Sequence, residues 1–128
     1  MVVRNALKAV AAALVAVTVL SAVSAFAVTG PSKGNAAEGK KIFTAKCVAC
    51  HKADGTGGVK LTGKPTPNWK DQKYVNDPKW TDDFLRDCIT NGKIQSGMVA
   101  WGKNGQVKPA DIENLIAYIH TLAATKKK

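Results

Sequence analysis

Five consecutive residues, Cys47-Val48-Ala49-Cys50-His51, carry the most informative chemistry in this chain. The C-x-x-C-H pattern is typical of the covalent attachment of a c-type haem. Two cysteines three positions apart lie on the same side of a helical turn, so both sulfurs can form thioethers to one edge of a porphyrin. His51 follows directly and can bind the iron from the proximal side. The motif therefore predicts one haem c, with its iron, per chain.

Two other interpretations of the motif are a zinc site and a redox-active disulfide. A zinc site usually takes four ligands from two separated pairs, but the remaining candidates, Cys88 and His120, form no second pair. A thioredoxin-like motif would need a βαβ pattern around it, and the sequence contains none. Haem attachment is the preferred hypothesis.

The N-terminal sequence predicts export. Arg4 and Lys8 precede an uncharged stretch at 9–29, which is rich in alanine, valine and leucine, and Ala25-Phe26-Ala27 fits a signal-peptidase site. We expect a secretory signal peptide at 1–27 and a periplasmic location. The alternative is an uncleaved membrane anchor facing the periplasm, because about 20 apolar residues can span a bilayer.

Cleavage after residue 27 would leave one small domain at 28–125 and a basic tail at 126–128. This mature chain would carry 17 basic and nine acidic residues. A hydrophobic core of this size is marginal on its own. A haem packed in the middle would supply much of the missing apolar burial.

Apolar spacing predicts an all-α fold with three main helices and long loops. The helices are expected at 35–50, from 77 or 81 to 91, and at 109–124, and the sequence shows no strand pattern. The intervening stretch at 52–76 is rich in glycine and proline and is expected to be an ordered loop around the cofactor. Gly39 interrupts the first helix, which indicates close approach of another helix.

Taken together, these segments resemble class I cytochrome c, the small monohaem electron carriers. The similarity covers residues 36–122 and rests on separated elements in the right order. Beside the haem motif these are Gly39-Lys40-x-x-Phe43, Gly58-Val59-Lys60-Leu61-Thr62-Gly63 (similar to a G-P-x-L-x-G loop), Ile89-Thr90-Asn91-Gly92-Lys93, Gly97-Met98-Val99-Ala100-Trp101-Gly102 and the helix at 111–122.

The resemblance implies a cytochrome c-like fold with His51 and Met98 as the two axial iron ligands. It also implies that the first and last helices cross, with Gly39 and Phe43 against Leu115 and Tyr118. A carbonyl of the loop at 58–63 is expected to accept the ring N–H of His51.

The chain departs from the family pattern at two positions. Val59 and Val99 stand where the family usually has proline, which leaves the loops on both sides of the haem less rigid.

Other candidate residues favour structural roles. His120 falls off the apolar stripe of its helix, so we expect a surface histidine rather than a distal ligand. Cys88 shares an apolar helix face with Phe84, Leu85 and Ile89 and is expected to pack as a small hydrophobe, although an intermolecular disulfide is the alternative. The three tryptophans are expected to fill the haem pocket and the core.

The main functional hypothesis is a monomeric one-electron carrier without enzymatic activity. Its basic surface predicts redox partners with acidic docking faces, no nucleic-acid binding, and membrane contact only if the N-terminal segment stays uncleaved. The alternatives are a haem-based sensor of NO or CO, and a haem subunit of a multi-subunit oxidoreductase.

Overall fold

The computed structural model describes residues 30–124, and the predicted signal peptide and basic tail lie outside this range. The described chain is helical and contains no strand, only an isolated antiparallel bridge between Lys93 and Met98. Its elements are α1 (Ala36–Lys46), α2 (Val48–His51), α3 (Gln72–Val75), α4 (Asp82–Asn91), a 3₁₀ turn (Ile94–Ser96) and α5 (Pro109–Ala124). The all-α prediction is confirmed.

The first predicted helix is divided in two. Asn35 caps α1, and its side chain accepts the backbone N–H groups of Ala37 and Glu38. The expected helix through residue 50 was wrong in one respect, because α1 ends at Lys46, with Cys47 as its C-cap, and the haem motif forms its own short turn, α2. This break lets the motif change direction toward the interior.

The middle and last helices match their predicted ranges closely. Thr81 caps α4 through a 3.1 Å hydrogen bond from the Phe84 N–H, and Gly92 ends the helix with φ of 71°. A side chain at Gly92 would also lie 2.6 Å from the Met98 carbonyl oxygen, so the turn needs glycine for both reasons. The short α3 was not predicted from the sequence.

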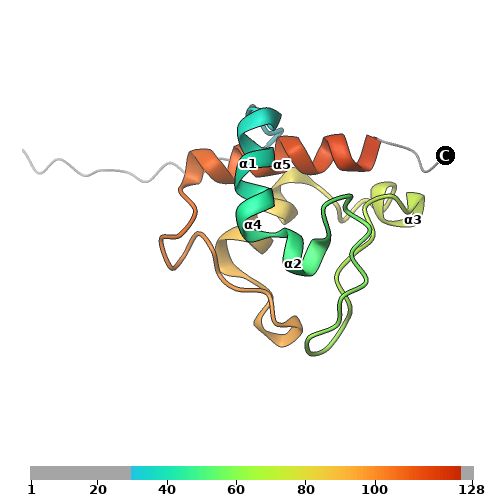
Figure 1. Ribbon diagram of the computed structural model, residues 1–128. Coiled ribbons are helices and arrows are strands. Elements are labelled where there is room, and N and C mark those ends of the chain that lie inside the picture. The colour runs from blue at the N-terminus through green and yellow to red at the C-terminus, as the bar shows by residue number, and fades with distance from the viewer. Residues whose placement is uncertain (1–29, 125–128) are drawn as a thin grey trace, which may run out of the picture.

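Among the helices of residues 30–124, α1 and α5 make the most extensive contact, and they cross each other (Figure 1). A Cβ atom on Gly39 would lie 1.9 Å from the Asn114 carbonyl oxygen, so only glycine allows the two backbones to meet. Phe43 packs edge-on against Tyr118 at 5.2 Å between ring centroids. The predicted crossing and its residues are therefore confirmed.

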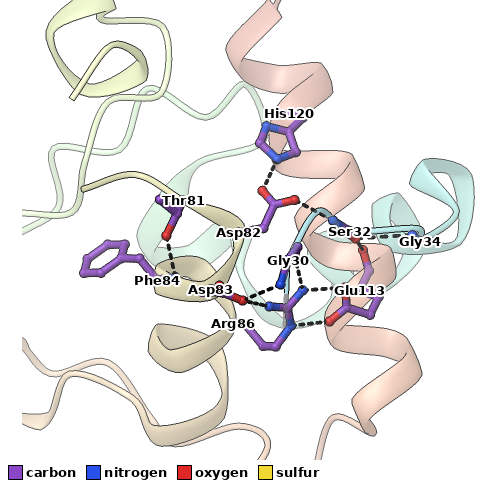
Figure 2. A network of polar contacts seen from close by, with 10 residues as sticks. All are labelled: Gly30, Ser32, Gly34, Thr81, Asp82, Asp83, Phe84, Arg86, Glu113 and His120. Atoms are coloured by element: carbon purple, nitrogen blue, oxygen red, sulfur yellow. Dashed lines mark hydrogen bonds and ion pairs between the residues drawn. The ribbon is translucent and has the colours of Figure 1, made fainter. Parts of the chain in front are cut away.

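A polar network joins α4, α5 and the segment before α1 (Figure 2). Arg86 on α4 donates two hydrogen bonds to Glu113 on α5, at 2.6 and 2.9 Å, and also pairs with Asp83. Ser32 donates its backbone N–H to Asp82 at 2.6 Å and its hydroxyl to the Glu113 carbonyl oxygen at 2.9 Å. These contacts fix the two helices that form one wall of the interior.

Long loops complete the molecule on the side away from the α1–α5 crossing (Figure 1). Two loop tips meet there, where the Thr62 hydroxyl donates to the Gln95 carbonyl oxygen at 3.0 Å. Within residues 30–124, no helix has the length and apolar character needed to cross a membrane.

Candidate haem site

The helices and loops enclose an apolar cavity of about 430 Å³, a size typical of cofactor sites. Cys47, Cys50, His51 and Met98 all line it, so the four residues singled out in the sequence are brought together by the fold. Most of the remaining wall is aromatic or aliphatic: Phe43, Leu61, Trp69, Tyr74, Trp80, Phe84, Leu85, Ile89, Trp101, Leu115 and Ile119.

The short helix α2 places the three motif residues on the cavity. The His51 N–H donates to the Cys47 carbonyl oxygen at 2.9 Å, and the Cys50 N–H donates to the same oxygen at 3.2 Å. Both cysteines are free thiols in the structure. Two thiols on one turn, next to an imidazole, form the donor set that a covalently attached haem requires.

His51 is buried, with 9% of its surface exposed. Burial lowers the pKa of its imidazole to about 4, so the ring is neutral at physiological pH, which is the form that binds metals. Its Nδ1 is buried and has no hydrogen-bond partner among the described residues.

The cavity also affects its cysteines. Burial raises the pKa of the Cys47 thiol to about 11, outweighing the opposing charge of Lys46. Cys88 on α4 lines the same cavity, and burial raises the pKa of its thiol as well. Cys88 is part-buried in the cavity wall, which agrees with the predicted packing role.

Met98 is held by the turn that carries it. Its backbone N–H and C=O both pair with Lys93, at 3.1 and 3.0 Å, and Gly97 adopts the left-handed conformation with φ of 83°. The bridge fixes the ends of the turn even though Val99 replaces a family proline and is itself 42% exposed.

His120 lies away from the cavity. Its side chain is 52% exposed, and Nε2 is 2.5 Å from an Asp82 carboxylate oxygen (Figure 2). The predicted surface role is confirmed. Across residues 30–124, no three side chains of histidine, cysteine, aspartate or glutamate form a group that could hold a metal ion.

The resemblance implied that a carbonyl of the loop at 58–63 accepts the ring N–H of His51, but among the described residues the buried Nδ1 atom of His51 has no hydrogen-bond partner. Thr62 and Leu61 of this loop contact the turn before Met98 instead, and a Cβ on Gly97 would lie 2.9 Å from the Leu61 Cβ. The ring that packs against His51 belongs to Trp69. A glycine pattern specifies where a loop can bend, but not which part of the fold it contacts, and this explains the error.

Three lysines stand at the cavity wall with exposed side chains. Lys46 lies over the Trp101 ring and Lys93 over the Phe84 ring, both at 5.4 Å from the ring centroid. Lys64 lines the cavity from the loop side. Sequence reasoning placed no lysine here, because charge alone does not reveal which surface a side chain shares.

Comparisons with known proteins agree with this site. The family model described as cytochrome c oxidase, cbb3-type, subunit III matches residues 34–119. A cytochrome c6 of Picosynechococcus sp. is 35% identical over 120 residues, covering 88% of this chain and 94% of the relative. A cytochrome c2 of Pararhodospirillum photometricum is 30% identical over 111 residues, or 70% of this chain and 98% of the relative.

The cbb3-type cytochrome c oxidase subunit FixP of Bradyrhizobium sp. is also similar, at 36% identity over 92 residues. That match covers 72% of this chain but spans only 29% of the length of FixP.

The fold and the cavity define a small helical monohaem protein. The chain belongs to the class I cytochrome c family, the family of monohaem electron carriers. Membership implies a covalently bound haem c, and the apolar cavity with its two free thiols and its buried neutral imidazole fits that group.

Proposed function

We propose that this chain is an exported carrier of single electrons, with one haem attached through Cys47 and Cys50 and ligated by His51 and Met98. The observation that carries the proposal is the convergence of these four side chains on one apolar cavity, although Met98 is distant in sequence. The bound haem would supply the reversible one-electron change between Fe(III) and Fe(II).

The protein's own residues would set the conditions for that change. Met98 would offer the iron a soft, neutral thioether, which would favour Fe(II) and keep small ligands such as CO away from the metal. His51 offers a neutral imidazole whose low pKa resists protonation. The aromatic wall, including Trp80 and Trp101, would exclude water and keep the site rigid.

The cavity mouth supports a docking role toward an acidic redox partner. Exposed Lys46 and Lys64 supply positive charge beside the cavity, whereas Lys93 is paired with Asp87 at 3.0 Å. Leu61 and Ile94 are 58% and 71% exposed on the loop tips. An apolar centre with basic neighbours fits a partner whose docking face is apolar at the centre and acidic at the rim. A carrier of this kind needs no enzymatic activity and would act as a monomer.

A second candidate is a haem subunit of a larger oxidoreductase. The match to the cbb3-type subunit III model and the similarity to FixP favour it. Sedimentation of the protein purified from its native membrane and soluble fractions separates the two. A soluble monomer supports the carrier, whereas tight copurification with oxidase subunits supports the second candidate.

Axial ligation can be tested by replacing Met98. Ferric wild-type protein should show the weak long-wavelength band of an iron–methionine bond, and ferrous protein should not bind CO at neutral pH. Met98→Ala should abolish the band, lower the reduction potential and admit CO, while His120→Ala should change none of these. Full CO binding by the wild-type protein would contradict the carrier proposal and favour a sensor of small ligands.

Attachment and export have separate tests. The mass of the purified protein should exceed that of the chain beginning near residue 28 by one haem, and the haem should survive acid–acetone extraction. Extractable haem would contradict attachment by Cys47 and Cys50. An intact N-terminus in a detergent-only fraction would indicate a membrane anchor.

A further inference from the structure

Trp69 stacks face to face on the imidazole of His51. The ring centroids are 4.8 Å apart and the planes differ by only 8°. Trp69 is 5% exposed and His51 is 9% exposed, so both stacked rings are buried. Near-parallel contact of two flat rings at this distance restricts rotation of the smaller ring about its own bond.

No hydrogen bond within the described chain fixes the plane of the His51 ring. A histidine that binds a metal almost always donates its other ring N–H to a carbonyl, a carboxylate or water, and this bond fixes the ring plane. The Nδ1 atom of His51 is buried without such a partner in the part of the chain that is described. The Trp69 face is therefore the contact that can orient the imidazole.

The indole is itself held in place. The Trp69 backbone N–H donates to the Gly55 carbonyl oxygen at 2.9 Å, and the Phe43 ring lies 5.9 Å away by centroid. A Cβ on Gly55 would lie 3.2 Å from Cε3 of Trp69, so the indole fills the space above this glycine. Backbone, glycine and phenylalanine together make a fixed platform.

We propose that Trp69 is a positioning residue that fixes the plane of the His51 imidazole through its aromatic face. This inference rests on the proposed function, since it assumes that His51 binds the haem iron. The ring plane of an axial imidazole sets how unpaired spin spreads over the ferric porphyrin.

Two substitutions of Trp69 in the haem-loaded protein separate the effect of its aromatic face from the effects of its indole N–H and its apolar bulk. Trp69→Phe keeps an aromatic face but lacks the indole N–H, which is itself buried without a partner among the described residues. Trp69→Leu keeps apolar bulk but has no face. Proton NMR of the ferric protein should show the wild-type order of hyperfine-shifted haem methyl resonances in Trp69→Phe, and a changed order in Trp69→Leu.

Ile116→Val serves as the control for a general loss of core packing. Ile116 is fully buried and does not line the cavity. This variant should lower the midpoint of thermal unfolding without reordering the methyl resonances. Trp69→Met provides a second side chain without a face, should Trp69→Leu fold poorly.

Two results would overturn the inference while leaving the proposed function intact. An unchanged resonance order and potential in both faceless variants would show that the stack does not position His51. A change in Trp69→Phe as large as that in Trp69→Leu would assign the role to the indole N–H. A wild-type protein without covalent haem or histidine ligation would instead contradict the proposed function.

Discussion

The α1–α5 crossing and the loop-built wall of the cavity are held together in different ways. At the crossing, backbones meet at Gly39 and the Arg86–Glu113 pair joins the adjacent helix α4, all within the protein itself. The loop wall at 52–71 and 93–108 has few buried side chains of its own and faces an apolar cavity. The comparison indicates that the crossing is the stable part of the chain, whereas the loop wall depends on what fills the cavity.

Removing both attachment cysteines should separate the two regions most strongly. In Cys47→Ser/Cys50→Ser, haem attachment should be lost, and the loop wall should lose protection because its apolar face would meet water. Hydrogen exchange should become fast at 52–71 and 93–108 while α1 and α5 keep part of their protection. Equal loss in both regions would mean that the crossing has no independent stability.

Adding a single methyl group at the crossing should lower the stability of the whole protein. Gly39→Ala places a Cβ at 1.9 Å from the Asn114 carbonyl oxygen, so the helices must separate. We expect a loss of about 3 kcal/mol in the free energy of unfolding, by analogy with severe overpacking. Denaturant unfolding of the haem-loaded protein measures it.

Whether Gly39→Ala lowers or raises the free energy of unfolding distinguishes the effect of helix packing from that of helix propensity. Alanine is the better helix former by about 1 kcal/mol, so propensity alone predicts that Gly39→Ala stabilises the protein. Ala45→Gly, on the exposed side of the same helix, should lose about that amount and no more. A stabilised Gly39→Ala variant would contradict the described crossing.

The polar network should make the helical region sensitive to acid. Hydrogen bonds from Arg86 lower the pKa of Glu113. Burial alone would raise the pKa of Asp82, but bonds from the Ser32 N–H and from His120 lower it overall. Carboxylates with depressed folded-state pKa values stabilise above their unfolded pKa values, near 4, and this stabilisation is lost as pH falls through the folded values.

Glu113→Gln should therefore weaken the protein at neutral pH and flatten its loss of stability at low pH. About 1–2 kcal/mol is expected, because the pair is partly shielded from solvent. Glu38→Gln breaks an exposed pair with Lys41 and should change stability by less than about 0.5 kcal/mol. The free energy of unfolding, measured from about pH 3 to about pH 7 so that the series spans the unfolded carboxylate pKa values near 4, checks both.

On the loop side, the side chain of Thr66 links the wall to the haem motif. Its hydroxyl donates to the Cys50 carbonyl oxygen at 2.7 Å and accepts the Val59 N–H at 3.0 Å. Thr66→Val keeps the shape and should cost about 1 kcal/mol, with faster hydrogen exchange confined to the loop. Thr44→Val removes an exposed hydroxyl bond on α1 and should leave the loop unchanged. Faster hydrogen exchange in α5 of Thr66→Val would contradict the proposed independence of the two regions.

The smallest effect concerns the lysines at the cavity mouth. Electron transfer to an acidic partner should slow as salt rises, since the Debye length falls to about 8 Å at physiological ionic strength. Lys64→Gln should weaken this salt dependence more than Lys33→Gln, because Lys64 lines the cavity, whereas Lys33 is exposed but does not. Stopped-flow rates against salt concentration measure the effect. A rate that does not change with salt would leave the lysines as an ordinary solvated surface.

The sequence by itself determined the haem motif and the all-α fold, and it predicted the helix crossing that the structure confirms. Asn35 and Thr81 begin their helices by local hydrogen bonding, and Gly92 ends α4 by its backbone preference. The sequence reveals both kinds of signal directly. Gly39 predicted the helix crossing because glycine costs a helix about 1 kcal/mol relative to alanine, and close approach of another backbone is a reason to keep it. The family resemblance supplied Met98 as a candidate ligand, and the structure places it on the cavity.

Only the tertiary structure decided the contacts made across the chain. Trp69 rather than the loop at 58–63 packs against His51, and Arg86 pairs with Glu113 on another helix. Neither contact has a local signature, because the rings and charges meet only after the loops have closed. Loop closure depends on chain entropy and on the shape of the cavity, and the identity of neighbouring residues in the sequence does not encode it.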